Sequence, residues 1–131
     1  MKIVSKYRSS KITVDGIKFD SKAEAAFYKH LKNKQAQGLI TTFEMQVPFE
    51  LQEGFGHPTR KTKAGKPARV TAIKYVTDFV VTYPSGQVKV IDVKGMQTVD
   101  FKLKAKLFMR KYGVPLYLAK RQRGIWEIKE F

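Results

Sequence analysis

Residues 75–95 (YVTDFVVTYPSGQVKVIDVKG) contain two runs rich in β-branched residues on either side of Pro84-Ser85-Gly86. This pattern predicts a β-hairpin, because Pro favours the second position of a type I turn and Gly favours the left-handed position that closes a three-residue loop. Such a loop pairs Tyr83 with Gln87. The register of both strands is then fixed by the turn.

Counting back along both strands from the turn places Asp78 directly opposite Asp92. Opposed side chains have Cβ atoms about 5 Å apart. Two ionised carboxylates at that separation repel each other by roughly 3 kcal/mol at an effective dielectric constant of about 20. A divalent cation between them would explain the placement, and a shared proton or a one-residue slip in the turn are the alternatives. Lys94 lies on the same face as Asp92, two residues further on.

The charge balance points to a polyanionic partner. Lys and Arg total 26 against 11 Asp and Glu, which gives a net charge of +15. Nucleic acid is the most common partner of so basic a chain, and an anionic membrane surface is the competing one. No apolar run reaches the length of a membrane span and no secretory signal opens the chain, so we expect a cytoplasmic protein that does not enter membranes.

Length and cysteine content limit the fold further. The 131 residues, 43% of them hydrophobic, suffice for one domain over residues 1–131 with a real core. The chain has no cysteine, which excludes disulfide scaffolds, thiolate zinc sites and cysteine nucleophiles.

The N-terminal third predicts an arm, a hairpin and a helix. Residues 1–11 are basic and polar, and indicate a loose arm that is either solvated or in contact with phosphates. Residues 12–19 predict a short hairpin with Asp15-Gly16 in its turn. Ser21 and Glu24 fit a capping box that begins a helix, so Glu24 has a structural explanation as a cap. The stripe predicted to be buried on this helix consists of Ala23, Ala26, Phe27 and Leu31.

Residues 39–51 alternate between apolar and polar side chains and predict a strand, which Pro48 makes an edge strand or an interrupted one. Gln46 is expected to face outward on this strand, with a place near a functional site as the alternative. Residues 52–69 contain three Gly and two Pro and predict an irregular, flexible, basic loop, either a flap over a phosphate backbone or a solvated insertion. Its cations are Arg60, Lys61, Lys63, Lys66 and Arg69. His57 has no second ligand residue at metal-binding spacing and is given no role.

The C-terminal third predicts a helix and two strands. The helix covers residues 99–112, between Thr98 as its cap and Gly113 as its end. Its predicted core side chains are Leu103 and Leu107, with Phe101 or Phe108 as further candidates. Lys102, Lys106 and Arg110 form a cationic stripe, either solvated or, for Lys102 and Lys106, directed at a bound phosphate. Strands are predicted over residues 114–119 and 125–131, joined by a basic turn, with Trp126 packed in the core.

A strand, a helix and a strand in succession imply a crossover, and hence a mixed α/β sheet with helices packed on it. Two opposed acids and a nearby lysine in a basic chain favour metal-dependent phosphodiester chemistry. Mg²⁺ takes one or two protein carboxylates and fills its shell with water and substrate phosphate. Lys94 would then orient the attacking water or stabilise charge on phosphorus.

Glu24 on a first helix, Asp78 on one strand and Asp92-Val93-Lys94 on the next resemble the PD-(D/E)XK nuclease superfamily. The segments FDSKAEAAFYKHL, YVTDFVV and VIDVKG are similar to those of small phage-encoded members, transposon-end nucleases and Holliday junction resolvases. The match covers residues 6–117 in the family's order. One departure is Thr77, which stands where a proline often precedes the first strand acid.

The resemblance implies a restriction-endonuclease-like αβββαβ core, preceded here by the N-terminal hairpin. It implies that Asp78 and Asp92 hold Mg²⁺ or Mn²⁺, that Glu24 coordinates the metal directly or contacts one of its ligands, and that Lys94 serves the attacking water. Gln46 resembles a glutamine sometimes found near such sites.

Three functions follow as hypotheses. The first is a metal-dependent DNA endonuclease acting on branched recombination intermediates such as four-way junctions, for which a two-fold homodimer would suit paired incisions. A phage-encoded enzyme of this kind would work in the bacterial host cytoplasm. The second is a catalytically silent nucleic-acid-binding module, which leaves the opposed acids unexplained. The third is a basic structural protein of a ribonucleoprotein or virion, for which no residue argues specifically.

Overall fold

The structure is a computed structural model that describes residues 11–131, so all of the arm predicted over residues 1–11 except Lys11 lies outside the described residues. The elements are, in order, β1 (Ile12–Val14), β2 (Ile17–Phe19), α1 (Lys22–Ala36), β3 (Thr42–Gln52), β4 (Phe55–Lys61), β5 (Pro67–Val70), β6 (Ile73–Thr82), β7 (Val88–Val93), α2 (Val99–Tyr112), β8 (Leu116–Gln122) and β9 (Ile125–Glu130).

Five strands form the central sheet, in the order β3-β6-β7-β8-β9. Neighbouring strands are antiparallel except β7 and β8, which are parallel and are connected through α2. The prediction of a mixed sheet with helices packed on it is therefore confirmed. Among the described strands, β3 pairs only with β6, so it is the edge strand of this sheet that Pro48 indicated.

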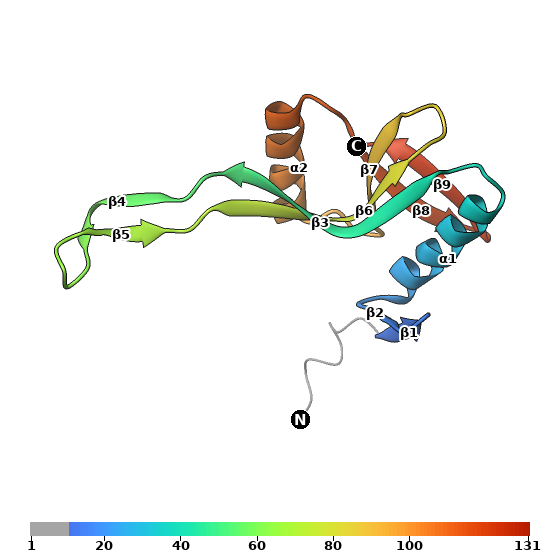
Figure 1. The fold of residues 1–131 in the computed structure, drawn as a ribbon, viewed down its shortest axis with the longest axis horizontal. Coiled ribbons are helices and arrows are strands. Elements are labelled where there is room, and N and C mark those ends of the chain that lie inside the picture. The colour runs from blue at the N-terminus through green and yellow to red at the C-terminus, as the bar shows by residue number, and fades with distance from the viewer. Residues whose placement is uncertain (1–10) are drawn as a thin grey trace.

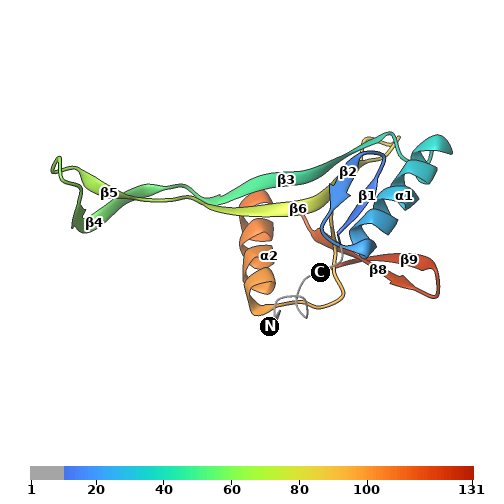
Figure 2. The same ribbon diagram turned by 90° about the horizontal axis from the view of Figure 1, so that it is seen from below.

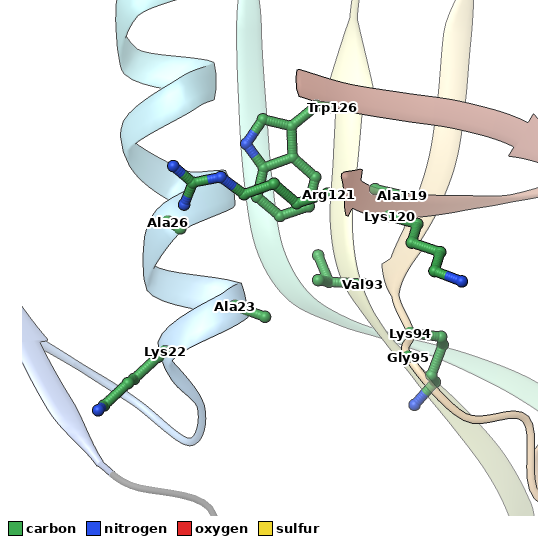
Figure 3. Close-up of a pocket in the computed structure, with 10 residues that line it drawn as sticks. All are labelled: Lys22, Ala23, Ala26, Val93, Lys94, Gly95, Ala119, Lys120, Arg121 and Trp126. Atoms are coloured by element: carbon green, nitrogen blue, oxygen red, sulfur yellow. The ribbon is translucent and has the colours of Figure 1, made fainter. Parts of the chain in front are cut away.

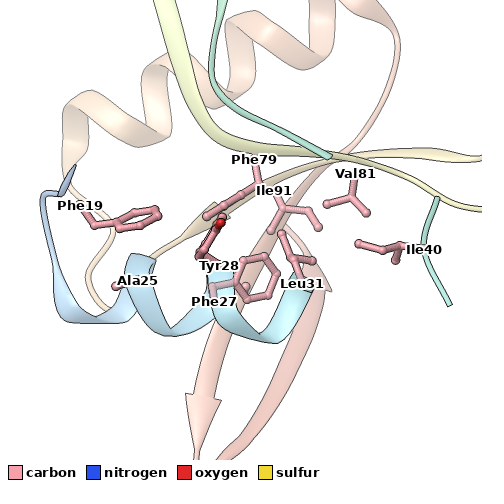
Figure 4. Close-up of a cluster of buried hydrophobic side chains, with 10 residues drawn as sticks. Phe19, Ala25, Phe27, Tyr28, Leu31, Ile40, Phe79, Val81 and Ile91 are labelled. Carbon is pink, nitrogen blue, oxygen red and sulfur yellow. The ribbon is translucent and has the colours of Figure 1, made fainter. Parts of the chain in front are cut away.

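The two helices cover opposite faces of the sheet (Figures 1 and 2). Alternate residues of the strands serve the two sides, as the pleat requires. On β7, Ile91 belongs to the core beneath α1 (Figure 4), whereas Val90 belongs to the core beneath α2. Trp126 packs against Phe27 of α1 with ring centroids 4.9 Å apart, which confirms its predicted packing.

The predicted helix ends and turns are confirmed by their hydrogen bonds. Ser21 Oγ accepts from the Glu24 N–H at 3.1 Å, and Thr98 Oγ1 accepts from the Phe101 N–H at 3.0 Å. Gly113 ends α2 in the left-handed conformation, with φ 68°. Asp15 and Gly16 both have positive φ, 52° and 77°, which is the conformation of a two-residue hairpin turn.

The buried faces of both helices differ from the prediction. On α1, Ala23 is exposed, whereas Ala25 and Tyr28 are buried beside Phe27 and Leu31. On α2, Leu103 and Leu107 are 57% and 41% exposed. The residues that α2 buries instead are Phe101, Ala105 and Phe108. Both sets on α2 have helical spacing, and the set with two aromatic rings removes more apolar surface from water.

The prediction of an irregular loop over residues 52–69 is wrong. β4 and β5 pair antiparallel with each other and form a two-stranded ribbon, which we call the β4–β5 ribbon (residues 55–70). It continues the β3–β6 hairpin beyond the sheet and projects away from both helices (Figures 1 and 2). The glycines and prolines do not prevent the two strands from pairing. They accompany an irregularity in it, since the register shifts between Gly56 and Lys61.

Candidate active site

The sheet opens at Asp78. Main-chain pairing of β6 with β7 runs from Thr82 and Val88 to Phe79 and Ile91, which is the predicted register, and there it ends. At the next position side chains replace the ladder. The Asp78 N–H donates to Asp92 Oδ1 at 2.7 Å, and the Val93 N–H donates to Asp78 Oδ2 at 2.9 Å. Asp78 and Asp92, which we call the acid pair, are therefore opposed, and the one-residue slip is excluded.

Asp92 is buried and is held in place by contacts with two other side chains. Its side chain is buried, the Tyr75 hydroxyl donates a hydrogen bond to its Oδ2, and Lys94 Nζ lies 4.0 Å from the same oxygen. Tyr75 itself is buried beneath α2, so the helix fixes the position of its hydroxyl. The Lys94 ammonium lies 5.0 Å from the centre of the Phe101 ring on α2, a cation–π distance that limits where it points.

Thr77, which stands where a proline is common in the PD-(D/E)XK pattern, has a structural role here. Its side chain is fully buried, and its hydroxyl lies 3.1 Å from the Ile91 carbonyl oxygen, to which it donates a hydrogen bond. The bond joins β6 to β7 beside the position where the main-chain ladder ends. A proline could not supply this hydroxyl.

The acid pair is electrostatically strained. Burial raises the pKa of Asp78 to about 7, and the neighbouring charges of Asp92 and Glu24 act in the same direction. The Val93 N–H and Lys94 oppose this rise only in part. Burial also raises the pKa of Glu24, with the charges of Asp20 and Asp92 adding to the effect and Lys94 opposing it. The charges of Asp92 and Glu24 thus raise the pKa of Asp78, and the charge of Asp92 also raises the pKa of Glu24.

A cavity of about 330 Å³, which we call the acid cavity, lies between Glu24 and Asp78. Glu24, Gln46 and Asp78 line it, together with Lys18 and Asp20. Ser21 caps α1 by accepting from the Glu24 N–H, which is one half of the predicted capping box. The other half, a bond from the Ser21 N–H to the Glu24 carboxylate, does not form in the described structure, and the Glu24 side chain lines the cavity instead. The structure thus places Glu24 at the third position of α1 with its side chain at the acid cavity, and its role toward a metal stays a prediction.

Gln46 is exposed, as expected of an outward-facing strand residue, but its backbone and its pairing are not those of an ordinary strand residue. It lies in the left-handed region, with φ 52°, which is uncommon for a residue other than glycine. Pairing of β3 with β6 skips it, passing from Met45 and Phe79 to Val47 and Thr77. Gln46 thus stands opposite Asp78 without a ladder pair and lines the acid cavity. Backbone strain of this kind gathers at functional sites.

A second cavity, of about 300 Å³, lies beside Lys94 and is lined by basic side chains (Figure 3). We call it the cationic pocket and define it by Lys22, Lys94, Lys120 and Arg121. The Arg121 guanidinium carbon lies 5.9 Å from the centre of the Trp126 ring at the same place. Sequence reasoning noted the basic turn after residue 119 and missed Lys22, because only the packing of α1 against the sheet brings these segments together.

The remaining predicted cations lie elsewhere. Lys102 and Lys106 are exposed on α2 and line neither the acid cavity nor the cationic pocket. The basic residues of the β4–β5 ribbon are also exposed and lie away from the acid pair (Figure 1). They are Arg60, Lys61, Lys63, Lys66 and Arg69.

The donor set of the acid pair fits one divalent cation. Hydrogen bonds reach three of its four carboxylate oxygens, namely both of Asp92 and Oδ2 of Asp78. Each carboxylate oxygen has two lone pairs, so acceptor capacity remains on both side chains. Two carboxylates with water and phosphate are a common ligand set for Mg²⁺. Within residues 11–131, no three acidic or histidine side chains lie close enough to hold a metal together, so Glu24 does not complete a three-acid cluster.

Fold and site together define a mixed α/β domain with a buried acid pair at an opening of its central sheet, flanked by a basic pocket. Residues 4–128 match the profile of the family described as "Protein of unknown function (DUF1064)", and the chain belongs to this family. A comparison with curated proteins found no match. Neither helix in the described part of the chain has the length and apolar character that crossing a membrane would require.

Proposed function

We propose that this chain is a Mg²⁺- or Mn²⁺-dependent DNA endonuclease of the PD-(D/E)XK type. The observation that carries the proposal is the acid pair. Asp78 and Asp92 are opposed at buried positions, and the pKa of Asp78 rises to about 7 because burial and the neighbouring charge of Asp92 both disfavour its ionised form. A buried arrangement that destabilises the folded chain is typical of a functional site.

Asp78 and Asp92 would hold the cation, and Glu24 would act on it from across the acid cavity. A bound divalent cation polarises the phosphorus centre and lowers the pKa of a coordinated water. Tyr75 and the Asp78 N–H orient the Asp92 carboxylate before any ligand arrives. Such preorganisation removes the cost of ordering the ligands during the reaction.

Lys94 is the residue that we assign to the attacking water or to the charge that develops on phosphorus. Its ammonium lies beside Asp92, its side chain is 33% exposed, and it also lines the cationic pocket. It therefore faces both the acid pair and a place where phosphates of the substrate can lie. Lys22, Lys120 and Arg121 would hold the neighbouring phosphates there by charge.

Gln46 supplies an amide at the mouth of the acid cavity. An amide carries both a donor and an acceptor, so it can bond a water and a phosphate oxygen at once. Its strained backbone and missing ladder pair support a positioning role for this residue. DNA with branches, such as a four-way junction, is the proposed substrate class, and a two-fold pair of chains would place two sites on a symmetric junction.

The test compares a four-way junction, a linear duplex and a single strand, each incubated with Mg²⁺, Mn²⁺ or EDTA. We expect cleavage with either metal and none in EDTA. Asp92→Asn should abolish cleavage while retaining DNA binding in EDTA, because the amide keeps its size and one acceptor oxygen. Glu44→Gln, an exposed acid on β3, is the matched control and should cleave like the wild type.

Titration calorimetry with Mn²⁺ gives a second readout that does not depend on activity. Wild type and Glu44→Gln should bind the ion, and Asp92→Asn should bind it at least tenfold more weakly. Cleavage that survives EDTA or Asp92→Asn would refute the two-carboxylate mechanism. DNA binding without cleavage under every condition would identify a silent nucleic-acid-binding module instead.

A further inference from the structure

The β4–β5 ribbon is long enough to act at a distance from the acid pair. From Gln52 to Lys61 the chain runs outward over about ten residues, which at about 3.3 Å per extended residue gives roughly 30 Å. Figures 1 and 2 show it leaving the sheet and extending away from both helices. A hairpin that makes its contacts mainly within itself is only marginally stable in water. The projecting ribbon is therefore better explained by contact with a partner than by packing within this chain.

The ribbon has a specific shape. A Cβ at Gly56 would lie 2.9 Å from Pro67 Cβ, and a Cβ at Gly54, just before β4, would lie 2.9 Å from the Val70 main-chain oxygen. The two strands therefore approach each other more closely than other side chains would allow. His57 Nδ1 accepts hydrogen bonds from the main-chain N–H groups of Thr59, at 3.1 Å, and Arg60, at 2.9 Å, which orders the segment where the register shifts.

The ribbon carries positive charge only. Residues 55–70 contain five Lys and Arg residues and no Asp or Glu, and all five are exposed. Two of them, Lys63 and Lys66, flank the tip, where the Thr62 N–H donates to the Lys66 carbonyl at 2.7 Å. Cations gathered on a projecting ribbon repel one another until an anionic surface lies between or beside them.

We propose that the β4–β5 ribbon lies in the major groove of the duplex DNA whose backbone reaches the acid pair. This inference rests on DNA as the substrate in the proposed function. A two-stranded ribbon fits the major groove of B-DNA, which is about 12 Å wide, and exposed cations on both strands of the ribbon would reach phosphates on both walls. The whole projection from Gln52 to Lys61 corresponds to about nine base pairs, so close to one helical turn of duplex beside the cleaved bond is required.

The groove distinguishes this placement from simple attraction of charge. A-form RNA has a deep, narrow major groove that protein side chains cannot enter. The ribbon should therefore strengthen binding to duplex DNA and leave binding to duplex RNA of the same sequence unchanged. A ribbon that only lies against phosphates would affect both duplexes alike.

The experiment measures binding in EDTA, where cleavage does not interfere. The tip variant carries Lys63→Gln and Lys66→Gln, and the control variant carries Lys29→Gln and Lys32→Gln on the exposed face of α1, so both lose two charges. For duplex DNA, the tip variant should lower the slope of log affinity against log salt by about 2, and the affinity by about 10- to 100-fold near 0.1 M salt. The control variant should match the wild type, and the tip variant should match the control on duplex RNA.

Protection of guanine N7 from dimethyl sulfate reports the groove directly, because N7 lies in the major groove. Wild type should protect guanines about one helical turn from the cleavage site, and the tip variant should not. An unchanged salt slope, an equal loss on DNA and RNA, or absent N7 protection would each overturn the proposal. Cleavage that depends on Asp92 together with any of these outcomes would leave the nuclease standing and remove the ribbon's role. Ribbon-dependent N7 protection without metal-dependent cleavage would do the reverse.

Discussion

Replacing Asp78 by asparagine should stabilise the protein at neutral and alkaline pH in the absence of metal. Burial and the charge of Asp92 raise the pKa of Asp78 to about 7 from its ordinary value of 3.8. Between these two pH values the folded chain holds a proton that the unfolded chain has released. The free energy of unfolding therefore falls as pH rises through this window.

The size of the effect follows from the same pKa. A difference of about 3 between the folded and unfolded values corresponds to about 4 kcal/mol at pH 8. Asparagine carries no charge at any pH in this range, and its carbonyl oxygen can still accept from the Val93 N–H. We therefore expect Asp78→Asn to unfold at a higher urea concentration than the wild type at pH 8. Its free energy of unfolding should be higher by about 2–4 kcal/mol at pH 8 and equal to that of the wild type near pH 4.

The assay is urea unfolding in EDTA between pH 4 and pH 8. The single tryptophan, Trp126, packs against Phe27 in the core beneath α1, so its fluorescence reports the transition. Glu44→Gln removes an exposed acid and should change stability by less than about 0.5 kcal/mol at every pH. A variant Asp78→Asn that is less stable than the wild type by the same amount at pH 4 and pH 8 would show that the acid pair is not strained. No bound cation would then be needed to explain the placement of Asp78 beside Asp92.

Variants at three neighbouring residues give further tests. Tyr75→Phe removes the hydroxyl that Asp92 accepts from, and should lower the free energy of unfolding by about 1–3 kcal/mol in urea titrations; an unchanged stability would mean that Asp92 finds another donor. Gln46→Gly relieves the left-handed backbone, so it should raise the free energy of unfolding by about 1 kcal/mol and slow cleavage. Gln46→Ala should slow cleavage without raising the free energy of unfolding. Faster cleavage by either variant would contradict the positioning role of Gln46. Lys94→Ala should lower kcat/KM about 10²- to 10³-fold in cleavage assays with DNA binding in EDTA altered less than tenfold, and full activity would remove Lys94 from the site.

Local chemistry made much of the fold predictable. The Pro84-Ser85-Gly86 turn fixes the register of its hairpin, as shown by the Tyr83 N–H donating to the Gln87 carbonyl at 2.8 Å. Ser21 and Thr98 begin helices through hydrogen bonds to the N–H group three residues further on. These signals depend only on neighbours in the chain, so no knowledge of packing was needed.

Predictions failed where a choice depended on packing. α2 offers two apolar stripes, and which one faces the sheet depends on the rings already present there: Phe108 packs between Tyr75 and Phe49, at centroid distances of 5.8 and 5.0 Å. In the β4–β5 ribbon, glycine and proline indicate a loop by composition, whereas in the structure Gly56 makes room for Pro67. The cationic pocket draws on three separate parts of the chain and has no local signal at all.

The opening of the sheet at Asp78 joins the stability argument to the site. On one side of Asp78 the ladder to β7 is replaced by carboxylate hydrogen bonds, and on the other side the ladder to β3 skips Gln46. A single strand position has thus lost regular pairing to both neighbours, within the buried part of the sheet. Each loss costs stability, and an apolar residue at Asp78 with regular pairing would cost none. Both interruptions converge on one carboxylate that lines the acid cavity, so the position fits the proposed metal site better than a purely structural role.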